Sequence, residues 1–496
     1  MAVNTLTQED LTQIADTFGY VTPQMCGAVC DGVTDDSAAF ALAVTKASNE
    51  KKKLLISGTL AIKEDVDISV LSSVVICGAS GQCAGAPSPG SSDASSKIVF
   101  YDGAKITTYI PTSITWRDVT FVSGDYTKAV AATEDTPAVE RVSVGTAFLV
   151  KSYKNTWENC TFCGFDKAFV LQEGAFANGN VNTWCGENKI ISCTFTDCNR
   201  GINVTDSNIS DNMVKDNICT STCDYFIYAE KHLGFWLITG NHDYAKHGSL
   251  LVLTGGVVSN NYFDGIGKLR LRGACFTFSS NTFLGTQAQY AQQVGWFNIC
   301  GTVEKATFTA NACYTPSSDK VVFAYIENPT NGSTTYVSNN RFTGNAMNTC
   351  SYVFAKPANI EGEATKKCVL FGNVIDDCLL EYTMHSNLCT FSKEAAVNEI
   401  RAVGSMLFGR YVVENEKING EWIPGTLVVV APHATTDNCT HIVTVTDTDD
   451  VTTTTIGRKN YVSVPNMNTV KKVSVQSFYP GQISGLAVPQ SCDYNS

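Results

Sequence analysis

Residues 237–283 carry one short phrase three times at a 20-residue interval: LITGNHD at 237–243, VVSNNYF at 257–263 and TFSSNTF at 277–283. Each phrase combines strand-forming residues with an asparagine at a turn. Related phrases extend the repeat in both directions along the chain. They are TWENCTF at 156–162, KIISCTF at 189–195, NISDNMV at 208–214, TFTANAC at 307–313, YVSNNRF at 336–342 and VLFGNVI at 369–375.

The period of this repeat indicates the fold class. Short β-rich phrases that recur at these intervals predict a β solenoid, in which each repeat is one coil and successive coils pair as parallel strands. Asparagine tolerates a left-handed backbone and bonds locally, so one per coil is expected at a recurrent bend, where stacked amides bond to one another. Coils of variable length predict loops that grow outward, where binding sites usually lie. The later asparagines are Asn212, Asn241, Asn261, Asn281, Asn311, Asn340 and Asn373.

The residues before the repeat predict a capping helix. Asp35 and Asp36 are suited to its start, and basic residues at 51–53 are suited to its end. Short strands follow at 54–56, 60–62 and 73–76, and polar turn residues separate the strand runs after residue 395. We therefore expect an attachment or cap segment at 1–24, a β-helix at 25–395 and a small β-sandwich-like domain at 396–496. The apolar face of the predicted helix contains Phe40, Ala43, Val44 and Ala47.

The stretch CGAVCDGVTDDSAAFALAVTKA at 26–47, followed by KKKLLISGTLAI at 51–62, resembles the opening of pectate-lyase-like β-helices, including bacteriophage tailspikes. The resemblance implies an all-β, right-handed, single-stranded parallel β-helix. It also implies a homotrimer attached to tail or baseplate proteins of a virion, which binds and often cleaves host surface polysaccharide. Cys26, Ser57 and Leu60 depart from the family pattern and place the chain far from plant-type pectinases. The matching residues are Gly27, Ala28, Asp31, Gly32, Asp35, Asp36, Ala39 and Gly58.

Composition excludes several kinds of partner. The formal net charge of −12 repels nucleic acid and anionic lipid surfaces, so we expect neither as a partner. No secretory signal begins the sequence, and no apolar stretch is long enough for a membrane helix, so we expect a product made in the host cytoplasm. The 20 cysteines are expected to be buried free thiols. Cys160-x-x-Cys163 lacks a second ligand pair at a similar spacing, so we expect no metal and no cofactor.

Three acidic residues are the candidate catalytic groups. The segments 166–173, 199–206 and 223–230 align with one another without gaps, which places Glu173, Asp206 and Glu230 in one column. Glycoside hydrolysis uses two carboxyl groups about 5 to 5.5 Å apart for retention, or about 6.5 to 9.5 Å apart for inversion. In a trimer the working pair could come from two chains. The alternative is that these acids form a solvated strand edge. Asp197, Asp211, Asp216 and Asp243 are competing acids.

Aromatic and basic residues near these acids are candidates for substrate binding. Flat aromatic rings stack on the apolar faces of sugars, although some of these rings must belong to the core. Lys167 and Arg200 align in neighbouring coils and are suited to an acidic sugar, or alternatively to an ion pair with Asp166. The aromatic candidates are Trp184, Tyr225, Tyr228 and Trp236, with Tyr244 close by.

The resemblance implies a tailspike that depolymerises polysaccharide, and the column of acids favours hydrolysis over lyase chemistry. A non-catalytic receptor-binding tail protein of the same fold is the first alternative, and a free polysaccharide lyase or hydrolase is the second. The fold by itself does not decide among them, because unrelated sites occur on one scaffold.

Overall fold

The computed structural model describes residues 17–78, 96–133, 137–181, 184–265, 268–284 and 295–314 and, beyond them, strands and short stretches as far as Asp493. The expected attachment segment at 1–24 lies mostly outside these residues. Two compact units divide the chain, Met1–Asp264 and Gly265–Ser496.

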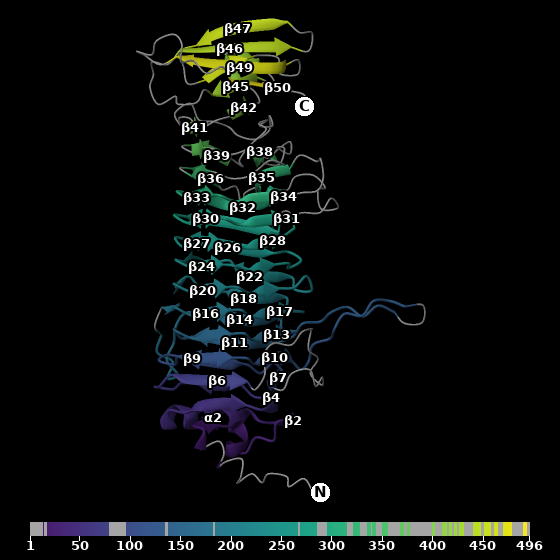
Figure 1. Cartoon of the computed structure of the whole chain (residues 1–496), viewed down its shortest axis with the longest axis vertical. Helices are drawn as coiled ribbons and strands as arrows, with labels where there is room; N and C mark the ends of the chain where they lie inside the picture. The colour runs from purple at the N-terminus through teal and green to yellow at the C-terminus, as the bar shows by residue number, and fades with distance from the viewer. Residues whose placement is uncertain are drawn as a thin grey trace. The chain divides into compact units, whose positions relative to one another are not determined.

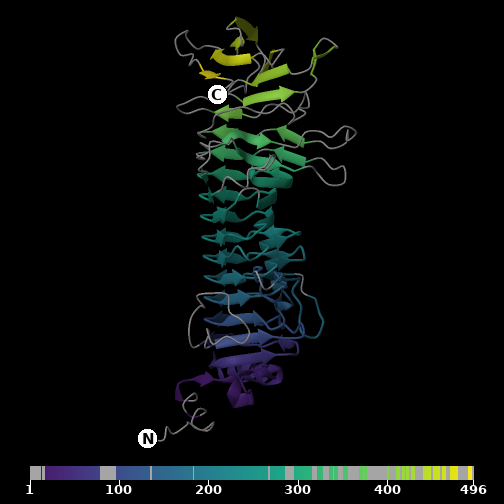
Figure 2. The ribbon, with the colours of Figure 1, turned by 90° about the vertical axis from the view of Figure 1, so that its right-hand side faces the viewer.

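The first unit is a right-handed parallel β-helix, as the repeat predicted. Its coils stack as successive layers (Figures 1 and 2), and each coil contributes one strand to each of three all-parallel sheets, here called A, B and C. Sheet A contains β1 Tyr20–Val21, β3 Lys53–Ile56, β6 Val74–Gly78, β9 Ile114–Arg117, β12 Thr156–Glu158, β16 Lys189–Ile191, β20 Met213–Lys215, β24 Leu237–Thr239 and β27 Val257–Ser259. Sheet B contains β2 Asp31–Asp35, β4 Gly58–Ile62, β7 Ser96–Phe100, β10 Thr120–Ser123, β13 Thr161–Cys163, β17 Thr194–Thr196, β21 Ile218–Cys219, β25 His242–Asp243 and β28 Tyr262–Asp264.

Sheet C carries the candidate site. Its main path contains β5 Val66–Ile68, β8 Ile106–Tyr109, β11 Thr146–Lys151, β14 Lys167–Leu171, β18 Arg200–Val204, β22 Tyr225–Ala229 and β26 Ser249–Thr254. Three short strands extend it beside this path: β15 Cys185–Gly186, β19 Ile209–Ser210 and β23 Leu233–Gly234.

A helix covers the beginning of the first unit, as the sequence predicted. A short 3-10 turn, η1 Pro23–Cys26, precedes the helix α2 Ser37–Glu50, whose predicted apolar face is buried. Asp36 occupies the N-cap position without a capping hydrogen bond, which differs from the expectation. Its buried carboxylate instead accepts hydrogen bonds from the backbone N–H groups of Val29 (2.7 Å) and Ala61 (3.2 Å). Asp36 therefore joins the start of the helix to β4.

The recurrent asparagines form two ladders rather than one series. One ladder stands where sheet A passes to sheet B, and there the Asn217 Nδ2 donates to the Asn241 Oδ1 (2.8 Å), whose Nδ2 donates to the Asn261 Oδ1 (2.9 Å). The other stands where sheet C passes to sheet A, and there Asn155 donates to the Asn188 Oδ1 (2.9 Å). In the first ladder, the residue directly before each asparagine has a positive φ, as Asp216 does before Asn217. Asn212 and Asn340 occupy the second kind of corner, and Asn373 lies outside the described residues.

Aromatic rings fill the interior of the first unit. Phe148 contacts Trp116, Phe121, Trp157 and Phe169, with ring centroids 5.0 to 5.5 Å apart. All of these rings are essentially inaccessible to water. This packing from coil to coil buries large apolar surfaces, which is the main stabilising contribution to folding.

The second unit continues the same pattern of parallel strands and ends in antiparallel strands. Its parallel strands run to β41 and its antiparallel strands begin at β42, close to the domain boundary expected at residue 395, which stays a prediction. The parallel strands are β29 Leu269–Ala274, β30 Thr277–Ser279, β31 Thr282–Leu284, β32 Gly295–Glu304, β33 Thr307–Thr309, β34 Ala312–Tyr314, β35 Val321–Ile326, β36 Thr335–Ser338, β37 Arg341–Thr343, β38 Cys350–Ala355, β39 Cys368–Phe371, β40 Val374–Asp376 and β41 Glu399–Arg401. The antiparallel strands are β42 Gly409–Val413, β43 Glu416–Ile418, β44 Glu421–Ile423, β45 Thr426–Val430, β46 Thr440–Asp447, β47 Thr452–Gly457, β48 Tyr461–Val464, β49 Val470–Phe478 and β50 Gln490–Asp493.

Among the described residues, no helix combines the length and the apolar character needed to cross a membrane.

Candidate functional site

The pairing of β14, β18 and β22 sets the geometry of the candidate site. Lys167 pairs with Arg200, so the predicted alignment of these two coils is confirmed. The next alignment placed Arg200 opposite Asp224, whereas the structure pairs Arg200 with Tyr225 and Val204 with Ala229. This prediction is therefore wrong by one position, and Glu230 does not share a register position with Asp206. The two coils differ because the turn after β21 is longer than the alignment allowed.

Glu173 and Asp206 lie together just past the ends of β14 and β18. The backbone N–H of Glu173 donates a hydrogen bond to the Asp206 Oδ2 (3.0 Å), and both side chains are half-buried. Glu230 follows β22 and is exposed, and its Oε1 accepts a hydrogen bond from the Tyr228 hydroxyl (2.8 Å). Glu173 thus contacts the Asp206 carboxylate through its backbone N–H, whereas Glu230 is hydrogen-bonded to the Tyr228 hydroxyl.

Arg200 begins β18 and contacts the neighbouring strand β22. Its guanidinium carbon is 3.8 Å from the centroid of the Tyr228 ring, and its Nη1 donates to the Asn203 Oδ1 (2.8 Å). The Tyr225 and Tyr228 rings meet edge to face with centroids 4.9 Å apart. Burial raises the pKa of Tyr228, and its hydrogen bond to the carboxylate of Glu230 raises it further, so the phenol keeps its proton and donates. A cation and two half-buried rings therefore share one outer face of sheet C.

Trp184 also has a side chain at the surface of this region. Its ring stacks on Tyr153 with centroids 5.4 Å apart and an interplanar angle of 25°, and its Nε1 donates to the Ser210 Oγ (2.8 Å). Both rings are half-buried, so their outer edges face solvent. This geometry suits a ring that packs against a sugar.

Trp236 does not fit its predicted role in substrate binding. Its side chain is 1% exposed, and its Nε1 donates to the carbonyl oxygen of Ile209 (2.8 Å). It is a core residue, because the turn from sheet C to sheet A points its ring into the coil. Sequence proximity to the acids did not distinguish inward from outward rings.

Lys167 makes the ion pair that was the alternative to sugar binding. Its Nζ lies 2.6 Å from the Asp166 Oδ2. Burial acts to raise the pKa of Asp166, but hydrogen bonds from Lys167 and Asn199 outweigh burial and hold that pKa below its usual range. Asp166 is therefore an anion that lies beside the lysine.

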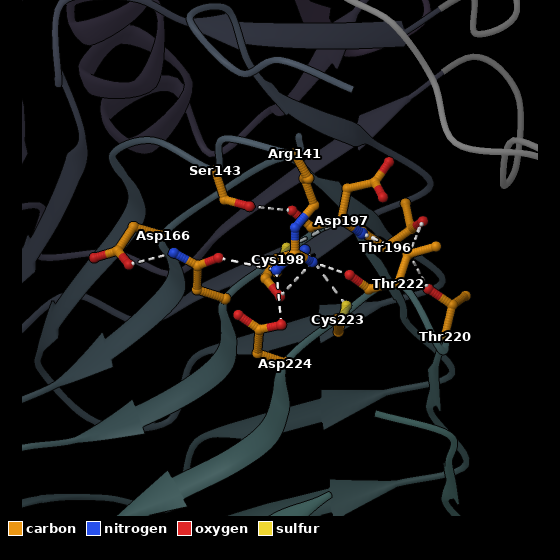
Figure 3. Close-up of polar contacts among 11 residues, drawn as sticks. Arg141, Ser143, Asp166, Thr196, Asp197, Cys198, Thr220, Thr222, Cys223 and Asp224 are labelled. Atoms are coloured by element: carbon orange, nitrogen blue, oxygen red, sulfur yellow. Dashed lines mark hydrogen bonds and ion pairs between the residues drawn. The ribbon is translucent and has the colours of Figure 1, made fainter. Parts of the chain in front are cut away.

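A polar network at the turn entering sheet C was missed by sequence reasoning (Figure 3). The Arg141 Nη2 lies 2.9 Å from the Asp224 Oδ1 and donates to the Asn199 Oδ1 (3.1 Å), while Asn199 donates to Asp166 (2.9 Å). Arg141 also donates to the carbonyl oxygen of Thr222. Arg141 is far from all of these partners along the chain, so no local pattern could have found it. Asp166, Asn199 and Asp224 directly precede Lys167, Arg200 and Tyr225, which pair with one another across neighbouring strands. The correct register would therefore have placed these three polar side chains in one row.

The competing acids have different environments. Asp197 is 3% exposed, and its Oδ2 has no hydrogen-bond partner among the described residues. Burial raises the pKa of Asp197, although a hydrogen bond from Thr222 acts in the opposite direction. Asp243 is buried and accepts a hydrogen bond from Ser249 (2.7 Å). Asp211 and Asp216 are exposed. In the part of the chain that the structure describes, no group of three His, Cys, Asp or Glu side chains is arranged to hold a metal ion.

Comparisons with known proteins show similarity at the level of the fold. No protein-family model and no curated protein sequence matches the chain. Among solved structures, DFA-IIIase from Arthrobacter chlorophenolicus in complex with DFA-III is 11% identical, with 77% of this chain and 99% of that chain covered and a TM-score of 0.50. A tailspike protein mutant of E. coli bacteriophage HK620 in complex with pentasaccharide is 11% identical, with 91% and 93% covered and a TM-score of 0.43.

A third match is a tailspike protein from the Acinetobacter baumannii bacteriophage Fri1, a capsular polysaccharide depolymerase. It is 10% identical, with 95% of this chain and 88% of that chain covered and a TM-score of 0.42. At identities of 10 to 11%, these likenesses show the fold alone.

Proposed function

We propose that the chain is a bacteriophage tailspike that binds host surface polysaccharide and cleaves it by glycoside hydrolysis. The single observation that carries the proposal is the contact between the Glu173 backbone and the Asp206 carboxylate, just past the end of β18, the strand that begins with Arg200. Two acidic residues on neighbouring coils, a cation and aromatic rings are the groups that binding and hydrolysis of an acidic glycan require.

In this mechanism, one of the two carboxyl groups donates a proton to the glycosidic oxygen. The other carboxylate attacks the anomeric carbon directly or removes a proton from the attacking water, depending on the separation of the two groups. Glu173 and Asp206 form the primary pair. Glu230 has a second role, because it holds the Tyr228 hydroxyl and thereby the ring beneath Arg200.

Substrate binding in this proposal depends on residues that surround the acids. Arg200 attracts a carboxylate or sulfate on the sugar, whereas Lys167 stays paired with Asp166. The Trp184–Tyr153 stack and the rings of Tyr225 and Tyr228 pack against apolar faces of the sugar.

A non-catalytic receptor-binding tail protein is the second candidate. The hydrogen bonds that Asp206 and Glu230 accept favour it, because a carboxylate that accepts a structural hydrogen bond need not take part in chemistry. In either case we propose a homotrimer carried by the virion, bound to tail or baseplate proteins and acting at the bacterial surface.

The test is to incubate the purified protein with capsule and cell-wall glycans of candidate hosts. New reducing ends without ultraviolet absorbance from unsaturated uronic products would support hydrolysis. Both signals together would support a lyase and overturn the proposed mechanism. Tight binding with neither signal would support the recognition protein.

A further inference from the structure

The corner loop, residues 174–181 after β14, has the sequence GAFANGNV. The backbone N–H of Phe176 donates a hydrogen bond to the carbonyl oxygen of Asn180 (2.9 Å), which closes the loop. From Phe176 onward, every residue of the loop is exposed. Its tip therefore presents the pair Asn178-Gly179 to water.

An asparagine that precedes a glycine can lose its side-chain amide to its own backbone. The nitrogen of the glycine attacks the side-chain carbonyl carbon of the asparagine, and a five-membered succinimide ring forms. The proton of the glycine N–H leaves with the side-chain nitrogen as ammonia. Water then opens the ring at either carbonyl and yields aspartate or isoaspartate. The reaction consumes one water molecule, releases one ammonia molecule and involves no oxidation. Glycine permits it best, because it has no Cβ to obstruct the ring and its backbone is the least restricted.

The Asn178 side chain is held in an orientation that favours this attack. Its Oδ1 accepts a hydrogen bond from the backbone N–H of Asn180 (3.1 Å), and this bond closes a turn that spans Gly179, the attacking residue. The N–H also stabilises the negative charge that develops on Oδ1 when the carbonyl carbon is attacked.

The space beside Gly179 is open. A Cβ placed on this residue would meet no atom within 4 Å apart from its chain neighbours, and its φ is +86°, a conformation that glycine adopts readily. No described side chain therefore obstructs the formation of the ring or the entry of the water that opens it.

One hydrogen bond slows the reaction. The Gly179 N–H donates to the carbonyl oxygen of Phe176 (2.9 Å), and this bond must break before the nitrogen can attack. Because the bond lies at an exposed loop tip, water replaces it when the tip opens, so opening costs little free energy. We therefore expect the reaction to be slower than in the unfolded chain and still to occur in the folded protein.

The chain provides an internal reference for this reaction. Asn180 lies in the same loop and is also exposed, but it precedes Val181, whose branched side chain obstructs the attack. Within the described part of the chain, Asn178 is the asparagine that precedes a glycine, and the pairs at 331–332 and 419–420 lie outside that part.

The buried asparagines of the first ladder lack both requirements. Asn241 is 2% exposed, and its amide both accepts a hydrogen bond from Asn217 and donates one to the carbonyl oxygen of Val214. The next residue, His242, carries a bulky ring. The chain thus has protected structural asparagines and one unprotected asparagine in the corner loop.

We propose that Asn178 is a modification site, at which the folded protein deamidates spontaneously to aspartate or isoaspartate. The reaction adds one negative charge to a loop that has none. The corner loop directly follows Glu173, so the new carboxylate lies on the same connection as this candidate catalytic acid. The proposal goes beyond the proposed function and does not depend on saccharide cleavage.

The test is to incubate the purified full chain at mildly acidic and mildly alkaline pH and to follow the tryptic peptide 168–189, which contains both Asn178 and Asn180. Fragment mass spectra locate the change from amide to acid, and labelling by isoaspartyl methyltransferase detects isoaspartate. Digestion in heavy-oxygen water marks any acid that forms during digestion itself. We expect the acid to accumulate at Asn178 and not at Asn180, and to form faster at alkaline pH, because the attacking nitrogen must lose its proton.

Gly179→Ala is the matched variant, because it keeps Asn178 and places a Cβ on the attacking residue. It should slow the reaction about tenfold, which corresponds to about 1.4 kcal/mol of activation free energy. The substitution lies in an exposed loop, so the coils should fold normally, as circular dichroism would verify.

The same chain unfolded in urea is the positive control, since all loop hydrogen bonds are then absent. An unmodified Asn178 in the folded protein, when the unfolded chain reacts, would show that the Gly179–Phe176 bond protects the loop and would overturn the proposal. Equal modification of Asn178 and Asn180, or an unchanged rate in Gly179→Ala, would also overturn it.

Discussion

The guanidinium carbon of Arg200 lies 3.8 Å from the centroid of the Tyr228 ring, and the hydroxyl of the same tyrosine donates to Glu230. Arg200 on β18 and Glu230, which follows β22 in the next coil, thus both contact the Tyr228 side chain. The arrangement fixes the position of the ring on the outer face of sheet C and leaves the guanidinium able to attract an anionic sugar.

This relationship gives the first prediction. Arg200→Ala should weaken binding of an acidic glycan by about tenfold, because it removes roughly 1.4 kcal/mol of interaction. Tyr228→Phe keeps the ring but loses the hydrogen bond to Glu230, so it should weaken binding less. Calorimetric titration with the glycan that the protein recognises would measure both effects. Equal binding by wild type and Arg200→Ala would exclude Arg200 from the binding site.

The proposed acids should differ from exposed acids in their effect on cleavage. Glu173→Gln and Asp206→Asn should each lower kcat by roughly 10²- to 10⁴-fold, the usual contribution of acid–base catalysis. Asp216→Asn changes an exposed carboxylate at the corner between sheets A and B and should leave kcat unchanged. Reducing-end assays would measure these rates. Full activity in a triple variant that also carries Glu230→Gln would show that the acids are a solvated strand edge.

The two tryptophans should separate binding from stability. Trp236→Ala removes a ring that is 1% exposed and should cost about 3 to 5 kcal/mol of unfolding free energy. Trp184→Ala removes a half-buried ring and should mainly reduce saccharide affinity. Urea denaturation and glycan titration of both variants provide the comparison. A large loss of stability in Trp184→Ala, with unchanged affinity, would identify Trp184 as a structural residue.

Asp197 and Asp166 should have opposite effects on the pH dependence of stability. Burial raises the pKa of Asp197 in the folded state, so its contribution is most favourable below the usual aspartate pKa and is lost as the pH rises through the raised value. Asp197→Asn should therefore raise the free energy of unfolding, relative to wild type, more at neutral pH than at acidic pH. Cys223 and the cations Arg141 and Lys128 lie near this carboxyl group and modify the shift.

The pKa of Asp166 is lowered, because the hydrogen bonds from Lys167 and Asn199 outweigh burial. Its stabilising contribution is present above the usual aspartate pKa and is lost as the pH falls through the lowered value. Asp166→Asn should therefore lower the free energy of unfolding at neutral pH relative to wild type. Denaturation curves from acidic to neutral pH would measure both variants, and a parallel response of the two would contradict the assignment.

The first asparagine ladder should contribute strongly to stability. The Asn241 Oδ1 accepts hydrogen bonds from the Asn217 backbone N–H and Nδ2, and its Nδ2 donates to the carbonyl oxygen of Val214. Asn241→Ala leaves several buried groups without partners and should cost roughly 2 to 4 kcal/mol. The exposed Asn178→Ala is the control and should change stability by less than about 0.5 kcal/mol. Equal midpoints of urea denaturation for the two variants would contradict a structural role of the ladder.

Much of the site required knowledge of how the coils pair. The alignment of Lys167 with Arg200 followed from the sequence, because both coils have the same strand pattern and the structure pairs them as aligned. The next alignment was wrong by one position, since the connection from Cys219 to Tyr225 is one residue longer than the paired connection from Phe195 to Arg200. Such an error changes which side chains share a row, so the column of three acids was not reproduced.

The sequence by itself determined the solenoid, its capping helix and the recurrent asparagine turns. These features depend on local residue preferences and on a repeat period, and both are visible along the chain. The tertiary structure decided which rings face inward, as Trp236 does and Trp184 does not, and which distant groups meet, as Arg141 and Asp224 do. The physical reason is that a side chain's partners come from neighbouring coils and from the long connection between β10 and β11, and their register depends on turn lengths that no local pattern encodes.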